Sequence, residues 1–247
     1  MRLTVVGCGD AFGSGGRLQT CYHIDIGMER FLIDCGATAL IGHARLGLDP
    51  NAVGTILISH LHGDHFAGLI WWLMHARYVS KRKAPLLIAG PSGIEERVRV
   101  TGEALFPGST TVPYQFSLSF KELLPGAAAR LGAIDVTVAE VRHPSGAPPY
   151  AMRCTGAGRT IAFSGDTEWV DALVDIGRDA DLLMTECHGF DRAPPYHLSW
   201  QVLSAKLPII GARRVMLTHM SEPMLANRAA TAGHGLILAE DGLVIDV

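Results

Sequence analysis

The chain has 247 residues, of which 48% are hydrophobic, and its formal net charge is −3. This length and apolar content allow one large core, so we expect residues 1–247 to form a single domain. Because acidic and basic residues are nearly balanced and spread along the chain, their overall charge predicts no general attraction to nucleic acid or to an anionic membrane. Five widely spaced cysteines without a C-x-x-C pair argue against a disulfide framework or a cysteine zinc knuckle, and they indicate a cytoplasmic protein.

The first half of the chain begins with strand-like segments and then alternates strands with helices. In chain order we expect strands at 3–7, 21–26 and 30–34, a helix at 37–47, a strand at 55–59, a helix at 65–79, a strand at 86–89, a helix at 92–105 and a strand at 114–120. The segment "GME" between the second and third strands is typical of a hairpin. Residues 124–133 are expected to form a loop.

The second half repeats this order. We expect strands at 134–141, 150–154 and 159–165, a helix at 168–177, a strand at 181–186, a helix at 198–207, a strand at 214–219, a short helix, and final strands at 236–240 and 243–247. Two successive series of strands and helices predict two sheets packed together with helices outside. The expected fold class is therefore α/β (α+β), as a four-layer αββα sandwich.

The segment "SHLHGDHFAG", residues 59–68, has the donor types of a metal site. Zinc binds imidazole nitrogen and carboxylate oxygen, and a catalytic site keeps one position open for water. An extended strand end can direct His60 and His62 toward one ion, and Gly63 permits a tight turn after them. Asp64 and His65 then face a second point, so the segment predicts two metal ions.

Three later residues follow predicted strands, as His60 does, and have side chains that can bind a metal ion. His143, Asp166 and His219 each follow a predicted buried strand, where functional side chains commonly lie. A chance cluster of histidines, or a structural site for one ion, does not account for these three additional donors.

The order H-x-H-x-D-H, His, S-G-D and T-H makes the chain similar to the metallo-β-lactamase superfamily. That resemblance implies that His60, His62 and His143 hold one zinc ion, that Asp64, His65 and His219 hold the other, and that Asp166 bridges them. Nitrogen and oxygen ligands also accept manganese or iron, so Mn²⁺ and Fe²⁺ remain alternatives to Zn²⁺. Paired metals can lower the pKa of a bridging water from about 15.7 to about 7, which suits phosphodiesters, lactones and thioesters.

Three features resemble the ribonuclease Z branch of this superfamily. They are the form "HLHGDHFAGL", the glycine-rich segment "GCGDAFGSGGR" at 7–17, and the pair Glu186 and His197. A carboxylate that orients an imidazole makes a proton donor for a leaving alkoxide, although the pair can also be a buried structural contact. The resemblance implies that Asp64, Glu186 and His197 are catalytic, and His188 is a minor candidate because it lies close to them in sequence.

The chain also departs from that branch. It has Thr-Glu-Cys-His and His-Leu-Ser where ribonuclease Z usually has His-Glu-Ala-Thr and His-Ser-Thr, and residues 143–166 leave no room for the long basic arm that grips tRNA. Since the arm and a basic charge are both missing, we expect a metal-dependent phosphodiesterase that uses a metal-bridging hydroxide on a small or cyclic nucleotide-type phosphodiester.

Other functions remain open. An RNA 3′-end endonuclease can use the basic segment 77–83 in place of the arm, within a homodimer, although a solvated helix end is the commoner explanation of such a segment. Further alternatives are a lactone or thioester hydrolase and a non-catalytic member of the fold. The expected partners are thus a small phosphodiester or, as the alternative, RNA. A membrane partner is not expected, because no apolar run approaches the roughly 18 residues that span a bilayer.

Overall fold

The computed structural model describes residues 1–27, 29–231 and 234–247, which build two seven-stranded sheets. The first sheet has the order β14 (Val244–Asp246), β1 (Arg2–Gly7), β2 (Cys21–Asp25), β3 (Arg30–Ile33), β4 (Val53–Leu57), β5 (Leu86–Gly90) and β6 (Leu118–Glu122). The second has the order β13 (Ile237–Leu238), β12 (Val215–Thr218), β11 (Leu182–Glu186), β10 (Arg159–Phe163), β9 (Tyr150–Gly156), β8 (Ile134–Glu140) and β7 (Ala129–Leu131).

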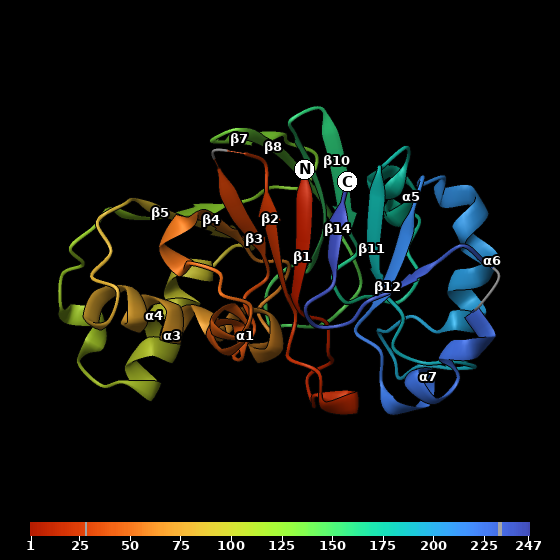
Figure 1. Ribbon diagram of the computed structural model, residues 1–247, viewed down its shortest axis with the longest axis horizontal. Helices are drawn as coiled ribbons and strands as arrows, with labels where there is room; N and C mark the ends of the chain where they lie inside the picture. Colours follow the sequence, from red (N-terminus) through yellow and green to blue (C-terminus); the bar gives the residue numbers. More distant parts are fainter. Residues whose placement is uncertain (28, 232–233) are drawn as a thin grey trace.

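Helices cover the outer face of each sheet (Figure 1). The α-helices are α1 (Ala39–Arg45), α2 (Gly63–Phe66), α3 (Gly68–Tyr78), α4 (Ile94–Leu105), α5 (Ala172–Gly177), α6 (Trp200–Ile210) and α7 (Glu222–Ala226). Short 3-10 helices are η1 (Ser14–Gly16), η2 (Pro50–Ala52), η3 (Ser109–Thr111) and η4 (Arg228–Thr231). Helices α1, α3 and α4 lie on the first sheet and α5, α6 and α7 on the second, which confirms the predicted αββα sandwich.

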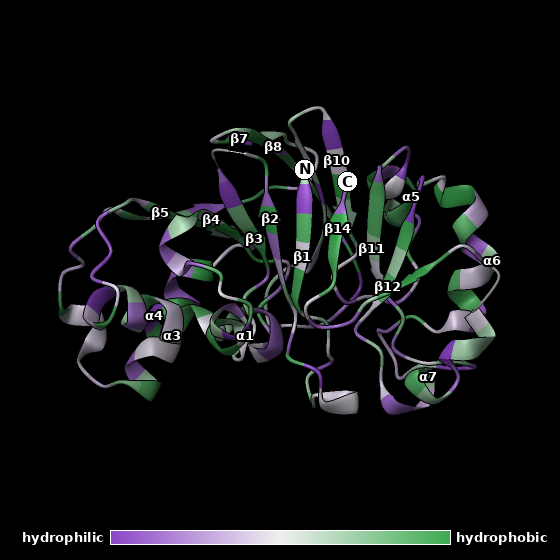
Figure 2. Ribbon diagram, in the orientation of Figure 1, coloured by the Kyte–Doolittle hydropathy of each residue, from purple (hydrophilic) through white to green (hydrophobic). Residues whose placement is uncertain are grey.

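Three apolar clusters hold the four layers together. Side chains alternate between the two faces of a strand, so in β1 Leu3 and Val5 point into the cluster between the sheets while Val6 packs toward the helices. A second cluster joins the first sheet to α1, α3 and α4, and a third joins the second sheet to α5, α6 and α7. Figure 2 shows the resulting hydrophobic strand interiors and the mixed surfaces of the helices.

The last strand of the chain does not join the sheet that precedes it in sequence. β14 returns to the first sheet and pairs antiparallel with β1, where Leu3 lies opposite Ile245. The two termini therefore lie side by side (Figure 1). This crossing ties the end of the chain to its beginning, and strand patterns alone did not predict it.

The strand directions bring several strand ends to one edge of the sandwich. β3, β4, β5 and β6 run parallel in the first sheet, and β10, β11, β12 and β13 run parallel in the second. β8 also runs this way, because it and β10 are both antiparallel to β9. The residues that follow these strands consequently share an edge, and this edge carries the candidate site.

The prediction of one continuous helix at 65–79 is wrong, because α2 ends at Phe66 and α3 begins at Gly68. The N–H of Gly68 donates to the carbonyl of Cys35 at 2.9 Å, which interrupts the helical ladder between α2 and α3. A Cβ on Gly68 would lie 2.1 Å from the carbonyl oxygen of Gly36. This close approach needs glycine, and it places α2 beside the end of β3.

Other predicted boundaries shift where tertiary contacts replace local preference. The strand expected at 114–120 is β6 at 118–122, and the expected loop at 124–133 contains β7, which forms a hairpin with β8 around Gly132, φ 58°. The helix expected at 168–177 begins only at Ala172. Strands β2 and β3 pair as the predicted hairpin, although Met28 in its turn lies outside the described residues.

Candidate metal centre

The motif His60–His65 starts three residues after β4 and continues into the short helix α2. His60 lies in the extended segment, His62 is the N-cap residue of α2, and Asp64 and His65 occupy its first turn. The second pair of donors therefore comes from a helical turn. This arrangement turns Asp64 and His65 away from His62, which produces the two directions that the spacing predicted.

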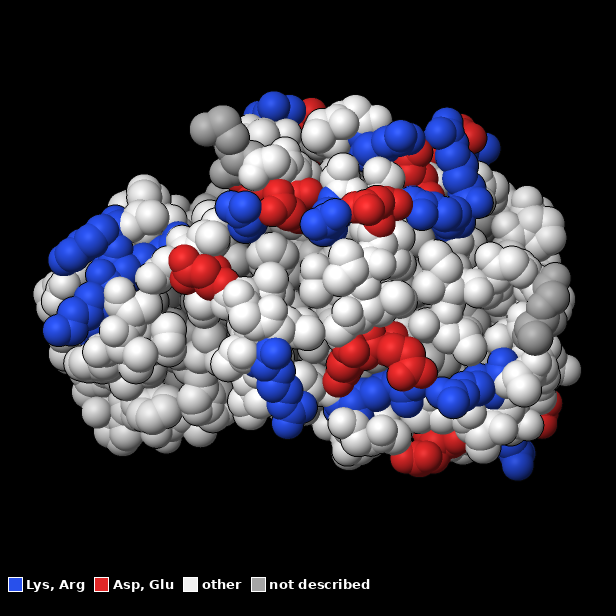
Figure 3. All heavy atoms as spheres, viewed as in Figure 1, with Lys and Arg blue, Asp and Glu red and all other residues white. Residues whose placement is uncertain are grey.

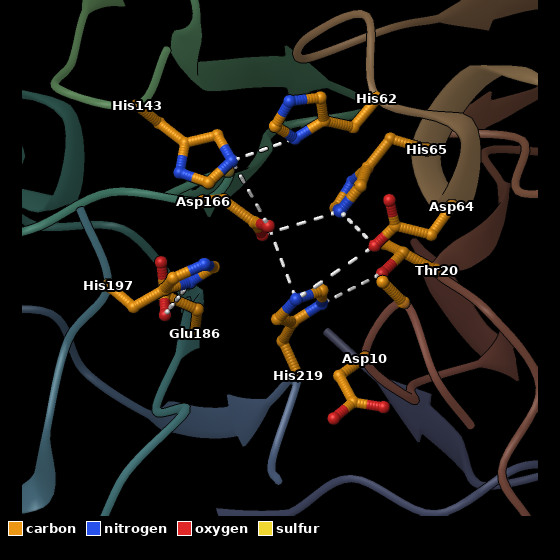
Figure 4. A network of polar contacts seen from close by, with 12 residues as sticks. Asp10, Thr20, His62, Asp64, His65, His143, Asp166, Glu186, His197 and His219 are labelled. Atoms are coloured by element: carbon orange, nitrogen blue, oxygen red, sulfur yellow. Dashed lines mark hydrogen bonds and ion pairs between the residues drawn. The ribbon is translucent and has the colours of Figure 1, made fainter. Parts of the chain in front are cut away.

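The structure brings together all seven residues that the sequence identified as metal ligands. The potential ligand atoms form two groups, each within 4.8 Å of one another: His60, His62 and His143; and Asp64, His65, Asp166 and His219. Figure 4 shows Asp166 between His143, His65 and His219. They come from loops after β4, β8, β10 and β12, so both sheets contribute to the site.

Asp166 has the most central position in this cluster. Its Oδ2 atom lies 3.8 Å from Nε2 of His60, 3.8 Å from Nε2 of His143 and 3.2 Å from Nε2 of His219. Its other oxygen, Oδ1, lies 3.4 Å from Nε2 of His65. One carboxylate thus contacts members of both groups, as a bridging ligand requires.

Hydrogen bonds at the far ring nitrogens orient several of these imidazoles. Nδ1 of His65 lies 2.6 Å from Oδ2 of Asp34, and Nδ1 of His60 lies 3.1 Å from the hydroxyl of Ser59. Nδ1 of His143 lies 3.1 Å from the carbonyl of Tyr196. Such contacts hold the ring so that Nε2 faces the ligand position.

The sequence reasoning missed Asp34, which the end of a predicted strand could have indicated. This residue is completely buried, and its two oxygens also accept hydrogen bonds at 2.7 Å from the backbone N–H and the hydroxyl of Ser59. It lies at φ 58°, a strained region for a residue other than glycine. His219 and Tyr196 are also left-handed, at φ 55° and 69°, so three strained residues surround the cluster.

Polar atoms without partners show that the cluster suits metal ions. Among the described residues, Nε2 of His60, Nε2 of His65 and Oδ1 of Asp166 are buried and have no hydrogen-bond partner. Buried polar atoms are normally satisfied, so three unpaired atoms within one cluster suit a bound cation. Imidazole nitrogen and carboxylate oxygen are donors that zinc and related divalent ions accept. The donor set therefore fits divalent metal ions.

Burial and charge set the protonation of these donors. Burial lowers the pKa of His60 well below its usual range, which leaves a neutral imidazole with a free lone pair. Burial by itself raises the pKa of Asp166, but the neighbouring His219 and His65 outweigh it and hold that pKa well below its usual range. A neutral imidazole beside an ionised carboxylate is the state that binds a cation.

Glu186 and His197 meet beside the ligand cluster. Nδ1 of His197 lies 3.2 Å from Oε2 of Glu186, which also accepts from the N–H of Leu198 at 3.1 Å. Oε1 accepts from the N–H of Thr167, next to Asp166. Burial raises the pKa of Glu186 to about 7 despite its bond to His197. Since a nitrogen of His197 lies within 4.8 Å of donor atoms of His143 and Asp166, the pair faces the ligand cluster.

The glycine-rich segment at 7–17 contacts the site, but its amides are engaged within the protein. The carboxylate of Asp10 accepts from the N–H groups of Phe12 at 3.2 Å and Ser14 at 2.9 Å. The N–H of Gly15 donates to Glu222 at 2.7 Å, and that of Gly16 donates to the carbonyl of Gly13. These four amides are therefore not directed at an anion, because carboxylates and a carbonyl of the protein already accept from them.

The basic segment 77–83 contains two buried arginines. Arg77 donates to the carbonyls of Ser109 at 2.6 Å and of Val112, and its guanidinium lies over the ring of Tyr114. Arg82 donates to five carbonyls, among them that of Val53 at 2.7 Å. These two cations therefore hold loops, so neither is available to a phosphate and neither belongs to a solvated helix end.

Charged side chains of both signs lie on the surface of the protein (Figure 3). On the face shown in Figure 3, basic and acidic side chains alternate along the strand ends. They include ion pairs such as Arg2 with Asp246 and Arg159 with Asp181. Within the described part of the chain, no helix has the length and apolar character needed to cross a membrane.

The chain is similar to known metallo-hydrolases and ribonucleases, in agreement with a cluster of potential metal ligands. The chain is 26% identical to the probable metallo-hydrolase YhfI of Bacillus subtilis, over 99% of each chain, and 24% identical to ribonuclease Z of Methanosarcina acetivorans, over 100% of this chain and 98% of that protein. The crystal structure of human tRNase Z, short form, superposes with a TM-score of 0.81 and 25% identity, covering 100% of this chain and 99% of that one.

The fold and the donor cluster therefore define a metal-dependent hydrolase of the metallo-β-lactamase fold, in its ribonuclease Z-like branch. Within this class, the family described as Anti-Pycsar protein Apyc1 matches residues 1–241. The chain belongs to that family.

Proposed function

We propose that this protein is a dinuclear phosphodiesterase that acts on a small or cyclic nucleotide-type phosphodiester. His60, His62 and His143 would hold one divalent ion, Asp64, His65 and His219 would hold the second, and Asp166 lies within reach of both groups. When bound, such an ion pair supplies Lewis-acid activation of water and of the phosphoryl oxygens. Zinc is the proposed metal, with manganese or iron as alternatives.

The contact between Glu186 and His197 is the observation that carries this proposal. Phosphodiesters have poor leaving groups, and a proton donor aids departure of the alkoxide. Oε2 of Glu186 accepts from Nδ1 of His197, which leaves Nε2 of that ring to donate toward the substrate. Burial lowers the pKa of His197, but the bond and charge of Glu186 outweigh it and raise the pKa above its usual value. The pair can thus supply a proton to a leaving oxygen.

The short connection between β8 and β10 supports a small substrate. It contains only β9 and turns, and the two inward-facing arginines of the basic segment do not replace a nucleic-acid arm. We also propose that residues 1–247 act as one domain, which the pairing of β14 with β1 supports.

The similarity to proteins named ribonuclease Z favours a second function, cleavage of an RNA 3′ end. Substrate comparison separates the two. The protein is loaded with zinc or manganese and assayed with a 3′,5′-cyclic nucleotide, bis(p-nitrophenyl) phosphate, a tRNA precursor, a lactone and a thioester. We expect metal-dependent cleavage of the first two.

Turnover of the lactone or thioester with no phosphodiester cleavage contradicts the proposal. Cleavage of the tRNA precursor at the same rate as the cyclic nucleotide, with salt-dependent binding, favours the second function. A protein that retains no zinc, manganese or iron after loading contradicts both and leaves a non-catalytic member of the fold.

A further inference from the structure

His188 lies among the imidazoles of the candidate metal centre, but it belongs to neither of the two proposed ligand sets. It follows β11, and its ring stacks on that of His197 with centroids 4.6 Å apart and an interplanar angle of 28°. One nitrogen from each of His188, His197 and His219 lies within 4.8 Å of the other two. A third imidazole therefore borders the space that His197 and the ligand cluster face.

The backbone around His188 is held from two sides. Its carbonyl accepts from the N–H of Ser221 at 3.1 Å and from the hydroxyl of the same residue. The next residue, Gly189, donates its N–H to the carbonyl of Leu198 at 3.2 Å and accepts from the N–H of Trp200 at 2.8 Å. Because the loops after β11 and β12 are joined here, the position of the His188 ring is set by the fold.

Only one nitrogen of His188 is left for a ligand. Its Nδ1 atom is covered by protein and has no hydrogen-bond partner among the described residues, while the residue as a whole is only half-buried. Nε2 is consequently the nitrogen that can meet a bound molecule. The two carboxylates whose charge acts on His188 have other partners, since Asp10 accepts from Phe12 and Ser14 and Asp166 lies among the proposed ligand imidazoles.

We propose that His188 donates a hydrogen bond from Nε2 to an oxygen of the substrate's phosphoryl group, beside the bond that His197 offers. This inference rests on the proposed phosphodiesterase function and adds a residue to it. One nitrogen of His188 lies within 4.8 Å of one nitrogen of His197, a separation that suits contacts to two oxygens of one tetrahedral oxyanion. The pair is therefore suited to a phosphoryl group.

The test compares zinc-loaded full-length proteins: wild type, His188→Ala, His188→Gln and His75→Ala. The last is a control on α3, outside the cluster. Inorganic phosphate is the probe, and its dissociation constant is measured by titration calorimetry, with zinc content by mass spectrometry. We expect His188→Ala to bind phosphate about tenfold more weakly, the size of one charge-assisted hydrogen bond, with unchanged zinc content. His188→Gln should recover part of the affinity, because its amide N–H₂ reaches the position of Nε2.

Three results overturn the inference. If His188→Ala loses zinc, the residue is a metal ligand. If both variants bind phosphate as the wild type does, the residue only packs against His197. If the zinc-loaded wild type binds no phosphate, there is no oxyanion site. Should His188→Ala fail to fold, the comparison of His188→Gln with wild type decides.

A wrong proposed function can be distinguished from a wrong role for His188. If the wild type binds phosphate but cleaves no phosphodiester, the proposed function is wrong. The phosphate dissociation constants of the variants still test the role of His188 in that case.

Discussion

Nδ1 of His65 lies 2.6 Å from Oδ2 of Asp34, and both side chains are completely buried. Burial by itself lowers the pKa of His65, but Asp166, Asp64 and Asp34 outweigh it and raise that pKa well above its usual range. The contact links the end of β3 to the first turn of α2. Asp34, which follows β3, therefore orients His65, a proposed metal ligand on α2.

Asp34→Ala should weaken binding of one metal ion more than the other. The substitution leaves Nδ1 of His65 and the backbone N–H of Ser59 without a partner, and loss of such a contact commonly costs about 10- to 100-fold in metal affinity. Competition with a chromophoric chelator measures both affinities. Asp246→Ala, which removes a surface ion pair with Arg2, is the control. Wild-type affinities in Asp34→Ala would show that this carboxylate does not orient the ligand.

His197→Ala should lower kcat for a phosphodiester by about 10²- to 10⁴-fold, because the substitution removes the proposed proton donor. Zinc content should stay at the wild-type level, because His197 is not a proposed metal ligand. Glu186→Gln should give a smaller loss, since the amide can still contact Nδ1 of His197. Steady-state kinetics with metal analysis on the same samples check both. A variant that loses zinc, or one that keeps wild-type kcat, contradicts the assigned role.

His43 should make folding stability depend on pH at a site remote from the metals. This residue is completely buried against Trp72, with ring centroids 4.9 Å apart, and burial lowers its pKa from 6.5 to about 4. The unfolded chain takes up a proton below about pH 6.5 and the folded chain does not, so stability is lost as pH falls from about 6.5 to about 4.

The measurement is the difference in unfolding free energy between wild type and His43→Phe at each pH, from urea denaturation. Other titrating groups, including His23 beside it, occur in both proteins. We expect the wild type to lose on the order of 3 kcal/mol relative to the variant across this window. A difference that stays constant with pH would contradict the assignment.

Gly68→Ala should destabilise the protein and disturb the metal centre. Its Cβ would lie 2.1 Å from the carbonyl oxygen of Gly36 and 2.6 Å from that of Cys35, so α3 must move away from the end of β3. Overpacking of this kind costs about 1–3 kcal/mol. Zinc content should also fall, because Asp64 and His65 lie just before α3. Gly54→Ala is the matched control, since its Cβ would meet nothing within 4 Å.

Urea denaturation measures both substitutions. Gly54→Ala should change the unfolding free energy by no more than about 0.5 kcal/mol. Equal stability of the two variants would mean that the contact between α3 and the end of β3 is not tight in solution.

The sequence by itself determined the donor types and their order along the chain. Seven candidate ligands were identified because each lies at or shortly after a predicted strand end, and the observed ends of β4, β8, β10 and β12 fall within two residues of the predicted ones. They are His60, His62, Asp64, His65, His143, Asp166 and His219. The αββα class was predictable for the same reason. Glu186 and His197 were found through resemblance to a family.

Contacts between residues far apart in sequence were decided only by the tertiary structure. Asp34 orients His65 because β3 and β4 run parallel and end together, and no local pattern indicates that pairing. Arg77 and Arg82 were expected at the surface, yet carbonyls of distant loops surround them. The segment "SHLHGDHFAG" at 59–68 thus contains four of the seven proposed ligands, whereas strand pairing and burial determine which side chains orient them.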